Sequence, residues 1–160
     1  MQELSSNLKT SSGIIHIVTI REGSVVSGEP SNLEQAYQRL LAGLREQLPH
    51  FQANYGLELL FFGDRIKPEE TTKRLKHDLP LNAKHVIAVA FPNKESLEKY
   101  YFDEHHVKIR RQFYCDLSPS LQLLYELMDR SESQAVAARL KLIIEQLVGS
   151  VLERRDYYAD

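Results

Sequence analysis

The segment HVIAVAFPNKESLEKYYFDEHH, residues 85–106, changes from an apolar run to a periodic polar run, and this change decides the fold class. Residues 86–90, VIAVA, are small or β-branched and apolar and Phe91 follows them, which is typical of a buried strand. Asn93 is suited to cap a helix, and Tyr100 and Tyr101 lie on neighbouring faces of that helix. We therefore predict a strand that leads directly into a helix, with a kink near Asp103.

The chain before this segment supplies two more strands and a helix. IIHIVTI, residues 14–20, and LELLFF, residues 57–62, have the composition of buried strands, and residues 33–48 carry apolar side chains at helical spacing. A charged excursion with two prolines, residues 67–84, separates the second strand from the third. The order of elements is βαββα.

The chain after this segment contains one ambiguous stretch and one clear helix. Residues 118–130 alternate in polarity from Leu121 to Leu127 as a strand does, but they open on Ser-Pro, a good helix start, and also fit helical spacing. These local signals slightly favour a helix. Residues 133–155 form one wide apolar stripe, which predicts a long helix.

The segment 85–111 resembles small dimeric α+β-barrel proteins of the ferredoxin-like superfamily, especially the uncharacterised DUF1330 group. In that group an apolar strand ends in Phe-Pro, an acidic helix start and an aromatic pair follow, and a basic pair closes the stretch. The corresponding residues here are Phe91-Pro92, Glu95, Tyr100-Tyr101 and Arg110-Arg111. The resemblance implies an α+β fold, a ferredoxin-like βαββαβ sandwich, with SLQLLYEL, residues 120–127, as its fourth strand. It also implies that two copies pair their sheets into a barrel.

Several features are extra to that family plan, and they set the expected domain boundaries. The long first helix, the excursion and the C-terminal helix have no counterpart in it. We expect a disordered N-terminus at 1–12, a ferredoxin-like α+β domain at 13–130 and an additional long C-terminal helix in an extension at 131–160. The wider superfamily includes cofactorless monooxygenases and haem-degrading oxygenases. The lack of tryptophan argues against haem cleavage.

Composition limits the partners and the compartment. With 20 basic and 22 acidic residues the net charge is −2, so no global field attracts nucleic acid or an anionic membrane. The polar N-terminus lacks the apolar core of a signal peptide, and Cys115 has no partner for an intrachain disulfide. We expect a cytoplasmic protein that binds neither nucleic acid nor membrane.

Four residues are the candidate ligand-binding set: His16, Phe62, Tyr101 and His105. Tyr101 and His105 are one helical turn apart, so a phenol and an imidazole can together hold or deprotonate a phenolic or carboxylic ligand. With His16 and Phe62 they are expected to line a cavity between sheet and helices. The alternative is structural: His16 and Tyr101 as core residues and His105 at its rim.

No motif names a cofactor or a metal. Asp103 and His106 can share a helix face, but the adjacent histidines diverge by about 100°, so one ion cannot easily take both. We expect no cofactor and no metal, and the residues that would carry catalysis are unknown. The function predicted is a small-ligand binding protein or cofactorless enzyme that forms a homodimer and takes a small aromatic or carboxylate ligand. The alternative is a non-catalytic interaction module that uses the C-terminal amphipathic helix, with a core similar to ubiquitin-like folds in LLFFGDRIKPEETTKRL and HVIAVAF.

Overall fold

The computed structural model describes residues 13–64 and 83–158, and the side chains of residues 61–64 are outside that description. The N-terminus predicted to be disordered, residues 1–12, and the predicted excursion up to residue 82 lie outside these ranges. The elements in chain order are β1 (Ile14–Arg21), α2 (Leu33–Tyr55), β2 (Glu58–Asp64), β3 (Ala83–Phe91), α4 (Lys94–Phe102), α5 (Glu104–Leu117), α6 (Pro119–Arg130), α7 (Gln134–Val148) and β4 (Leu152–Tyr158). No helix in the described ranges is long and apolar enough to cross a membrane.

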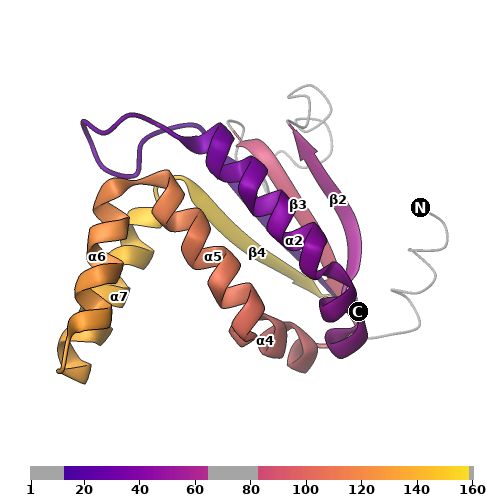
Figure 1. Cartoon of the computed structure of the whole chain (residues 1–160). Coiled ribbons are helices and arrows are strands. Elements are labelled where there is room, and N and C mark those ends of the chain that lie inside the picture. Colours follow the sequence, from indigo (N-terminus) through magenta and orange to yellow (C-terminus); the bar gives the residue numbers. More distant parts are fainter. Residues whose placement is uncertain (1–12, 65–82, 159–160) are drawn as a thin grey trace.

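The four strands form one antiparallel sheet in the order β2-β3-β1-β4. In Figure 1 the helices lie on one side of this sheet: α2 and α5 run across it, and α6 and α7 form a hairpin at one end. The predicted α+β class is confirmed. The topology is a βαββ unit followed by four helices and a returning edge strand, which is a ferredoxin-like connection with an enlarged second helical segment.

The fourth strand is not the one that the family resemblance implied. Residues 120–127 lie inside α6, because Pro119 occupies the first helical turn and the Ser118 hydroxyl accepts a hydrogen bond from the Leu121 amide. The ambiguity at 118–130 is thus resolved in favour of the helix. The fourth strand is β4, formed by LERRDYY near the end of the chain.

The predicted helix at 133–155 is therefore too long. It ends at Val148, where Gly149 and Ser150 form a turn, and the chain then pairs with β1 from Leu152 onward. The apolar residues Val151 and Leu152 continue the helical stripe in sequence, so the pattern alone hides the turn. The expected domain boundary at 130/131 separates α6 from α7, and β4 beyond it belongs to the common sheet.

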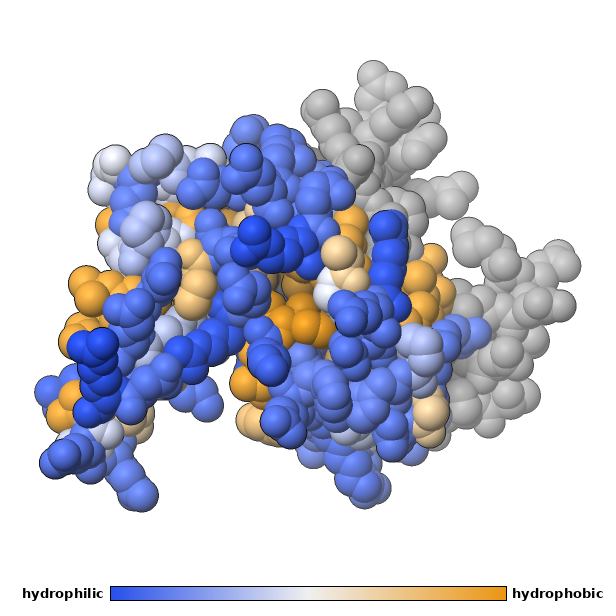
Figure 2. Space-filling model, viewed as in Figure 1, coloured by the Kyte–Doolittle hydropathy of each residue, from blue (hydrophilic) through white to orange (hydrophobic). Residues whose placement is uncertain are grey.

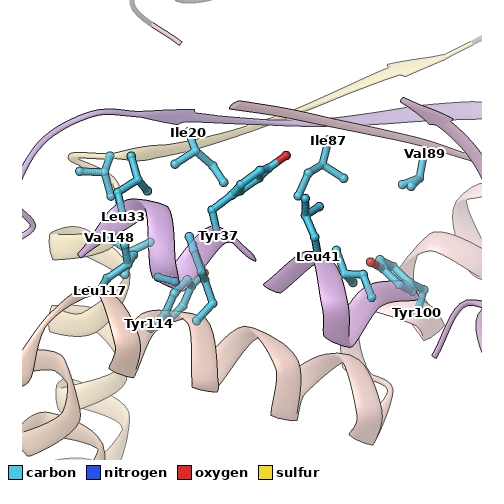
Figure 3. Packing of buried hydrophobic residues seen from close by; sticks show 14 of the residues in the cluster. Ile20, Leu33, Tyr37, Leu41, Ile87, Val89, Tyr100, Tyr114, Leu117 and Val148 are labelled. Carbon is cyan, nitrogen blue, oxygen red and sulfur yellow. The ribbon is translucent and has the colours of Figure 1, made fainter. Parts of the chain in front are cut away.

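The core lies between the sheet and the helices that cross it. Figure 3 shows Ile20, Ile87 and Val89 of the sheet facing Tyr37 and Leu41 of α2, with Tyr114 of α5 below them. Tyr37 stacks on the His85 ring of β3 with the two ring centroids 3.7 Å apart. The apolar spacing predicted for the first helix is the face that α2 buries here.

The predicted kink near Asp103 is a complete break between two helices. Asn93 caps α4 by accepting a hydrogen bond from the Ser96 amide at 2.8 Å, as its position predicted. Asp103, with extended φ and ψ of −60° and 136°, ends α4 and caps α5 by accepting from the His105 amide at 2.8 Å. The two helices therefore have independent rotational phases.

Phe91→Ala should lower the free energy of unfolding by about 3–5 kcal/mol, because Phe91 is 2% exposed and its removal leaves a cavity beside Tyr100. The matched control is Phe102→Ala, at a side chain that is 69% exposed, which should cost less than about 0.5 kcal/mol. Urea denaturation of both variants measures the difference. Equal losses would show that Phe91 is not a core residue.

Candidate functional site

A small cavity of about 60 Å³, here called the inner cavity, lies between the helix-facing side of the sheet and helices α2, α4 and α5. Most of its wall is apolar. The apolar and aromatic side chains that line it are Val18, Leu40, Leu44, Ile87, Val89, Tyr100, Phe113, Tyr114 and Leu152. Its polar groups lie on β1, β4, α4 and α5.

The strand register places a carboxylate beside the one imidazole that β1 contributes to this wall. His16 of β1 lies opposite Asp156 of β4, and its Nδ1 donates to Asp156 Oδ1 at 2.5 Å. The His16 side chain is only 10% exposed, whereas that of Asp156 is 40% exposed. In a neutral imidazole, donation from Nδ1 leaves the lone pair on Nε2, and an imidazole held by a carboxylate in this way can act as a general base.

A guanidinium and two phenols form the next part of the wall. Arg154, two residues before Asp156 on the same face of β4, donates to the Tyr101 hydroxyl at 2.9 Å and to the Tyr114 hydroxyl. Its nearest carboxylate oxygen is Glu145 Oε2, at 3.8 Å. A second guanidinium, that of Arg110, lies over the Tyr101 ring at 4.2 Å from the centroid. Tyr101 is thus held between two cations.

One stripe of α5 supplies the remaining polar side chains. His106, Arg110 and Tyr114 are spaced four residues apart and all line the inner cavity. Burial lowers the pKa of His106 to about 3, with a further contribution from Arg110, and its Nδ1 donates to the Tyr101 carbonyl at 3.2 Å. His106 is therefore neutral at physiological pH. Burial also raises the pKa of the Tyr114 phenol, so that group stays protonated.

A second hollow of about 210 Å³, here called the outer cleft, lies beside the inner cavity. Three residues, His16, Tyr101 and Arg154, line both hollows. The outer cleft is otherwise lined by Lys94, Leu97, Glu98, Phe102, Asp156 and Tyr158. The three shared side chains are therefore the layer between the inner cavity and the outer cleft.

The structure brings together two of the four predicted site residues. His16 and Tyr101 share the inner cavity. The side chain of Phe62 is outside the described part of the chain, and its backbone in β2 lies opposite Ile87. His105 lies elsewhere, because the break at Asp103 removes the helical turn that would have placed it beneath Tyr101. His106 occupies the position in the wall that the spacing had assigned to His105.

Sequence reasoning missed Arg154 and Asp156, which supply the strongest charges of the site. Arg154 was placed in the predicted C-terminal helix, residues 133–155, where alternate residues have no common side, and Asp156 directly after it. As a strand, LERRDYY puts Leu152, Arg154 and Asp156 on one face. The sequence did contain one signal, the turn-forming pair Gly149-Ser150. After such a turn the chain can continue as a strand, in which Arg154 and Arg155 point to opposite faces.

A separate polar cluster lies at the junction of α4 and α5, here called the Asp103 cluster. Asp103 Oδ2 accepts hydrogen bonds from His50 Nε2 at 2.9 Å and from the Tyr55 hydroxyl, both on the last turns of α2. His105 Nδ1 lies 3.2 Å from Oδ1. Burial raises the pKa of Asp103, but the hydrogen bonds from Tyr55 and His50 outweigh this and hold the pKa well below its usual value. The hydrogen bond to Asp103 also raises the pKa of the Tyr55 hydroxyl to about 12.

Comparison with known proteins gives weak structural likenesses only. The chain matches no protein-family model and no curated protein. It is similar to a dimeric ferredoxin-like protein of unknown function from Jannaschia sp. CCS1, with 12% identity and a TM-score of 0.45 over 66% of this chain and 86% of that one. It is similar to a hydroxynitrile lyase from Passiflora edulis, with 11% identity and a TM-score of 0.49 over 94% and 95%. A dimeric ferredoxin-like protein of unknown function from Bacteroides fragilis has 10% identity and a TM-score of 0.38 over 92% and 96%. Likeness at this level supports no inference about a ligand or a reaction.

Asp103→Ala should lower the free energy of unfolding by about 2–4 kcal/mol, because it removes the cap of α5 and the bonds from His50 and Tyr55 to a charged acceptor. The matched control is Asp129→Ala, which breaks an exposed ion pair with Arg111 and should cost less than about 1 kcal/mol. Chemical denaturation measures both. A loss at Asp103 no larger than that at Asp129 would contradict the importance of the junction.

Proposed function

We propose that the protein binds a small organic anion, a carboxylate or phenolate with an apolar body, at the layer formed by His16, Tyr101 and Arg154. The observation that carries this proposal is Arg154. Its side chain is only 26% exposed and its donors meet two phenol hydroxyls, while the nearest carboxylate oxygen is 3.8 Å away. The ion pair of Arg154 with Glu145 is long, and a planar anion is the group whose geometry matches this partly buried guanidinium.

The charges around this layer favour an anion. Arg110 and Arg154 both lie at the Tyr101 ring, with centroid distances of 4.2 and 5.3 Å. The carboxylates nearby are Asp156, which is held by His16, Glu145, and Glu98 of the outer cleft, which pairs with Lys94. A bound carboxylate would replace the phenol hydroxyls as the acceptor of the Arg154 donors, and the apolar walls of the inner cavity would take its hydrocarbon part.

The His16–Asp156 pair supports chemistry without a cofactor. The carboxylate fixes the imidazole so that Nε2 has its lone pair available, which is the arrangement of a general base. A ligand that enters with an acidic hydroxyl or carboxyl group can give its proton to His16 and leave its negative charge beside Arg154. The pair thus suits either the binding of an acid or a proton-transfer reaction on it.

The second candidate function is a non-catalytic interaction module, and the α6–α7 hairpin is the observation that favours it. Its outer residues Leu123, Leu127, Val136 and Leu142 are 47–65% exposed. In Figure 2 orange residues are seen at the surface of this hairpin, on the left. An exposed apolar surface on a helical hairpin can bind the apolar face of a partner helix.

We also propose that the protein is a homodimer that pairs through its sheet. In Figure 1 the described helices all lie on one side of the sheet. The opposite face carries Ile15 and Ile17 of β1 beside Ala90 and Ala88 of β3, as the strand register shows. Ile15 and Ile17 are partly exposed. Two of the similar solved structures are described as dimeric.

Benzoate, phenylacetate and 4-hydroxybenzoate, titrated into the protein by calorimetry, should bind, and the neutral isostere benzamide should not. Arg154→Met and Tyr101→Phe should each weaken binding by about 1–3 kcal/mol, because each removes a polar partner at the shared layer. Arg155→Met is the matched control: its side chain, the next along β4, bonds Glu153 and is absent from both hollows.

Three results would contradict the proposed binding site. The first is that none of the acids binds to the wild-type protein. The second is that Arg155→Met weakens binding as much as Arg154→Met. The third is that both arginine variants bind as well as the wild type, which would place the acid outside the inner cavity and the outer cleft.

Light scattering at tens of micromolar should give twice the chain mass of 18.5 kDa. Ile17→Lys should give a monomer, because it places a charge in the middle of the proposed sheet interface, which for a stable dimer buries about 1,600 Å² in all. Leu142→Lys, on the hairpin, should leave the dimer intact. A monomeric wild type, or a dimer that Leu142→Lys disrupts and Ile17→Lys does not, would overturn the sheet interface.

A further inference from the structure

We propose that His50, Asp103 and His105 form a binding site for a first-row divalent transition metal ion, and that this ion is Zn²⁺. The three side chains come from two elements that are far apart in sequence, the C-terminal half of α2 and the start of α5. Among the described residues they form the one group of three or more His, Cys, Asp or Glu side chains whose potential ligand atoms all lie within 4.8 Å of one another.

The two distances from the imidazole nitrogens to the carboxylate oxygens are compatible with a coordination shell. Nitrogen and oxygen ligands at about 2.0–2.2 Å from Zn²⁺, at angles of 90–110° to each other, are about 2.9–3.5 Å apart. His50 Nε2 lies 2.9 Å from Asp103 Oδ2, and His105 Nδ1 lies 3.2 Å from Asp103 Oδ1. The imidazole rings of His50 and His105 are tilted by 49° with centroids 4.3 Å apart. Small side-chain rotations can therefore direct both nitrogens and the carboxylate to one ion.

The ligand types select the metal. Mg²⁺ and Ca²⁺ prefer shells made of oxygen, whereas two imidazoles and one carboxylate suit Zn²⁺ and its transition-metal neighbours. The side chain of Asp103 is 8% exposed, and those of His50 and His105 are 32% and 47% exposed. The carboxylate is thus enclosed, while the histidine side leaves room for water or a further ligand in the fourth position.

Neighbouring polar groups lie against two of the ligands. The Tyr55 hydroxyl donates to Asp103 Oδ2, which orients the carboxylate. Asn54 lies on the far side of the His50 ring, with its amide nitrogen 3.1 Å from His50 Nδ1. When Nε2 binds the metal, the ring proton resides on Nδ1, and rotation of the Asn54 amide presents its carbonyl oxygen to that proton. Such outer partners are usual for metal-bound histidines.

The competing explanation is a hydrogen-bonded junction that binds no metal. His50 and Tyr55 would then serve only to satisfy the buried carboxylate and to join α2 to α5. His105 distinguishes the two explanations. The His105 backbone amide donates the capping hydrogen bond to Asp103 Oδ1, and this bond remains when the imidazole is removed. The His105 side chain is therefore needed for a metal site and dispensable for the junction.

The test uses the full chain, with any affinity tag of histidines removed and with metals stripped by EDTA. Zn²⁺ titrated against a fluorescent chelator should bind with a stoichiometry of one per chain. His50→Ala and His105→Ala should each raise the dissociation constant at least tenfold. His106→Asn is the matched control, because the neighbouring imidazole faces the inner cavity and should leave Zn²⁺ affinity unchanged. Co²⁺ should give visible absorption bands that both alanine variants lose.

Each alternative result overturns the metal site. They are the absence of Zn²⁺ binding, an affinity that either alanine variant retains in full, and equal binding of Mg²⁺ or Ca²⁺. Thermal unfolding in EDTA shows whether each variant is folded. A His105→Ala protein that is as stable as the wild type in EDTA but gains no stability from Zn²⁺ separates loss of a ligand from loss of the fold.

Discussion

The carboxylate of Asp103 is the constraint on which the helical layer and the candidate site depend. Its backbone amide donates to the Tyr100 carbonyl at 3.1 Å and ends α4, while its side chain caps α5 through the His105 amide. The other carboxylate oxygen accepts from His50 and Tyr55 of α2. One residue thus ends one helix through its backbone, and its enclosed side chain begins the next helix and ties it to a third. The bonds that it accepts keep it ionised despite its burial.

This break determines which side chains reach the inner cavity. Because α4 and α5 have separate phases, Tyr101 of the first helix and His106 of the second meet at the same wall, and the next turns of α5 add Arg110 and Tyr114. His105 is left on the α2 side, where it joins His50. His105 and His106 are adjacent in the unbroken helix α5, so the ordinary turn of about 100° per residue points them to different sides, and the break at Asp103 determines which of them meets Tyr101.

The parts of the fold that rest on local signals were predictable. The strands at 14–20 and 57–62, the first helix and its apolar face, and the Asn93 cap all follow from short-range patterns of residues. The break at Asp103 was also visible as a kink, but its consequence was not, because a pattern of spacings assumes one continuous helix. That assumption put His105 rather than His106 beside Tyr101.

The last strand was not predictable because its stability comes from pairing across the whole chain. LERRDYY has few apolar residues, and the two before Glu153 extend the stripe of α7. Its strand conformation depends on β1, more than 130 residues earlier in the chain, with Ile14 opposite Tyr158 and Ile20 opposite Leu152. The charges missed in the candidate site, Arg154 and Asp156, were lost with it.

Because β4 lies at the edge of the sheet, the charged side chains of Arg154 and Asp156 have two consequences. An edge strand with unpaired backbone groups invites pairing with another chain, and charged side chains directed toward the protein are one feature that opposes it. Arg154 and Asp156 are such side chains, and both face the helical layer. Burying them costs free energy that the phenols of Tyr101 and Tyr114 and the imidazole of His16 offset in part. The same inward charges that oppose extension of the sheet therefore add polar groups beside an apolar cavity, and this is the combination on which the proposed binding of a small organic acid rests.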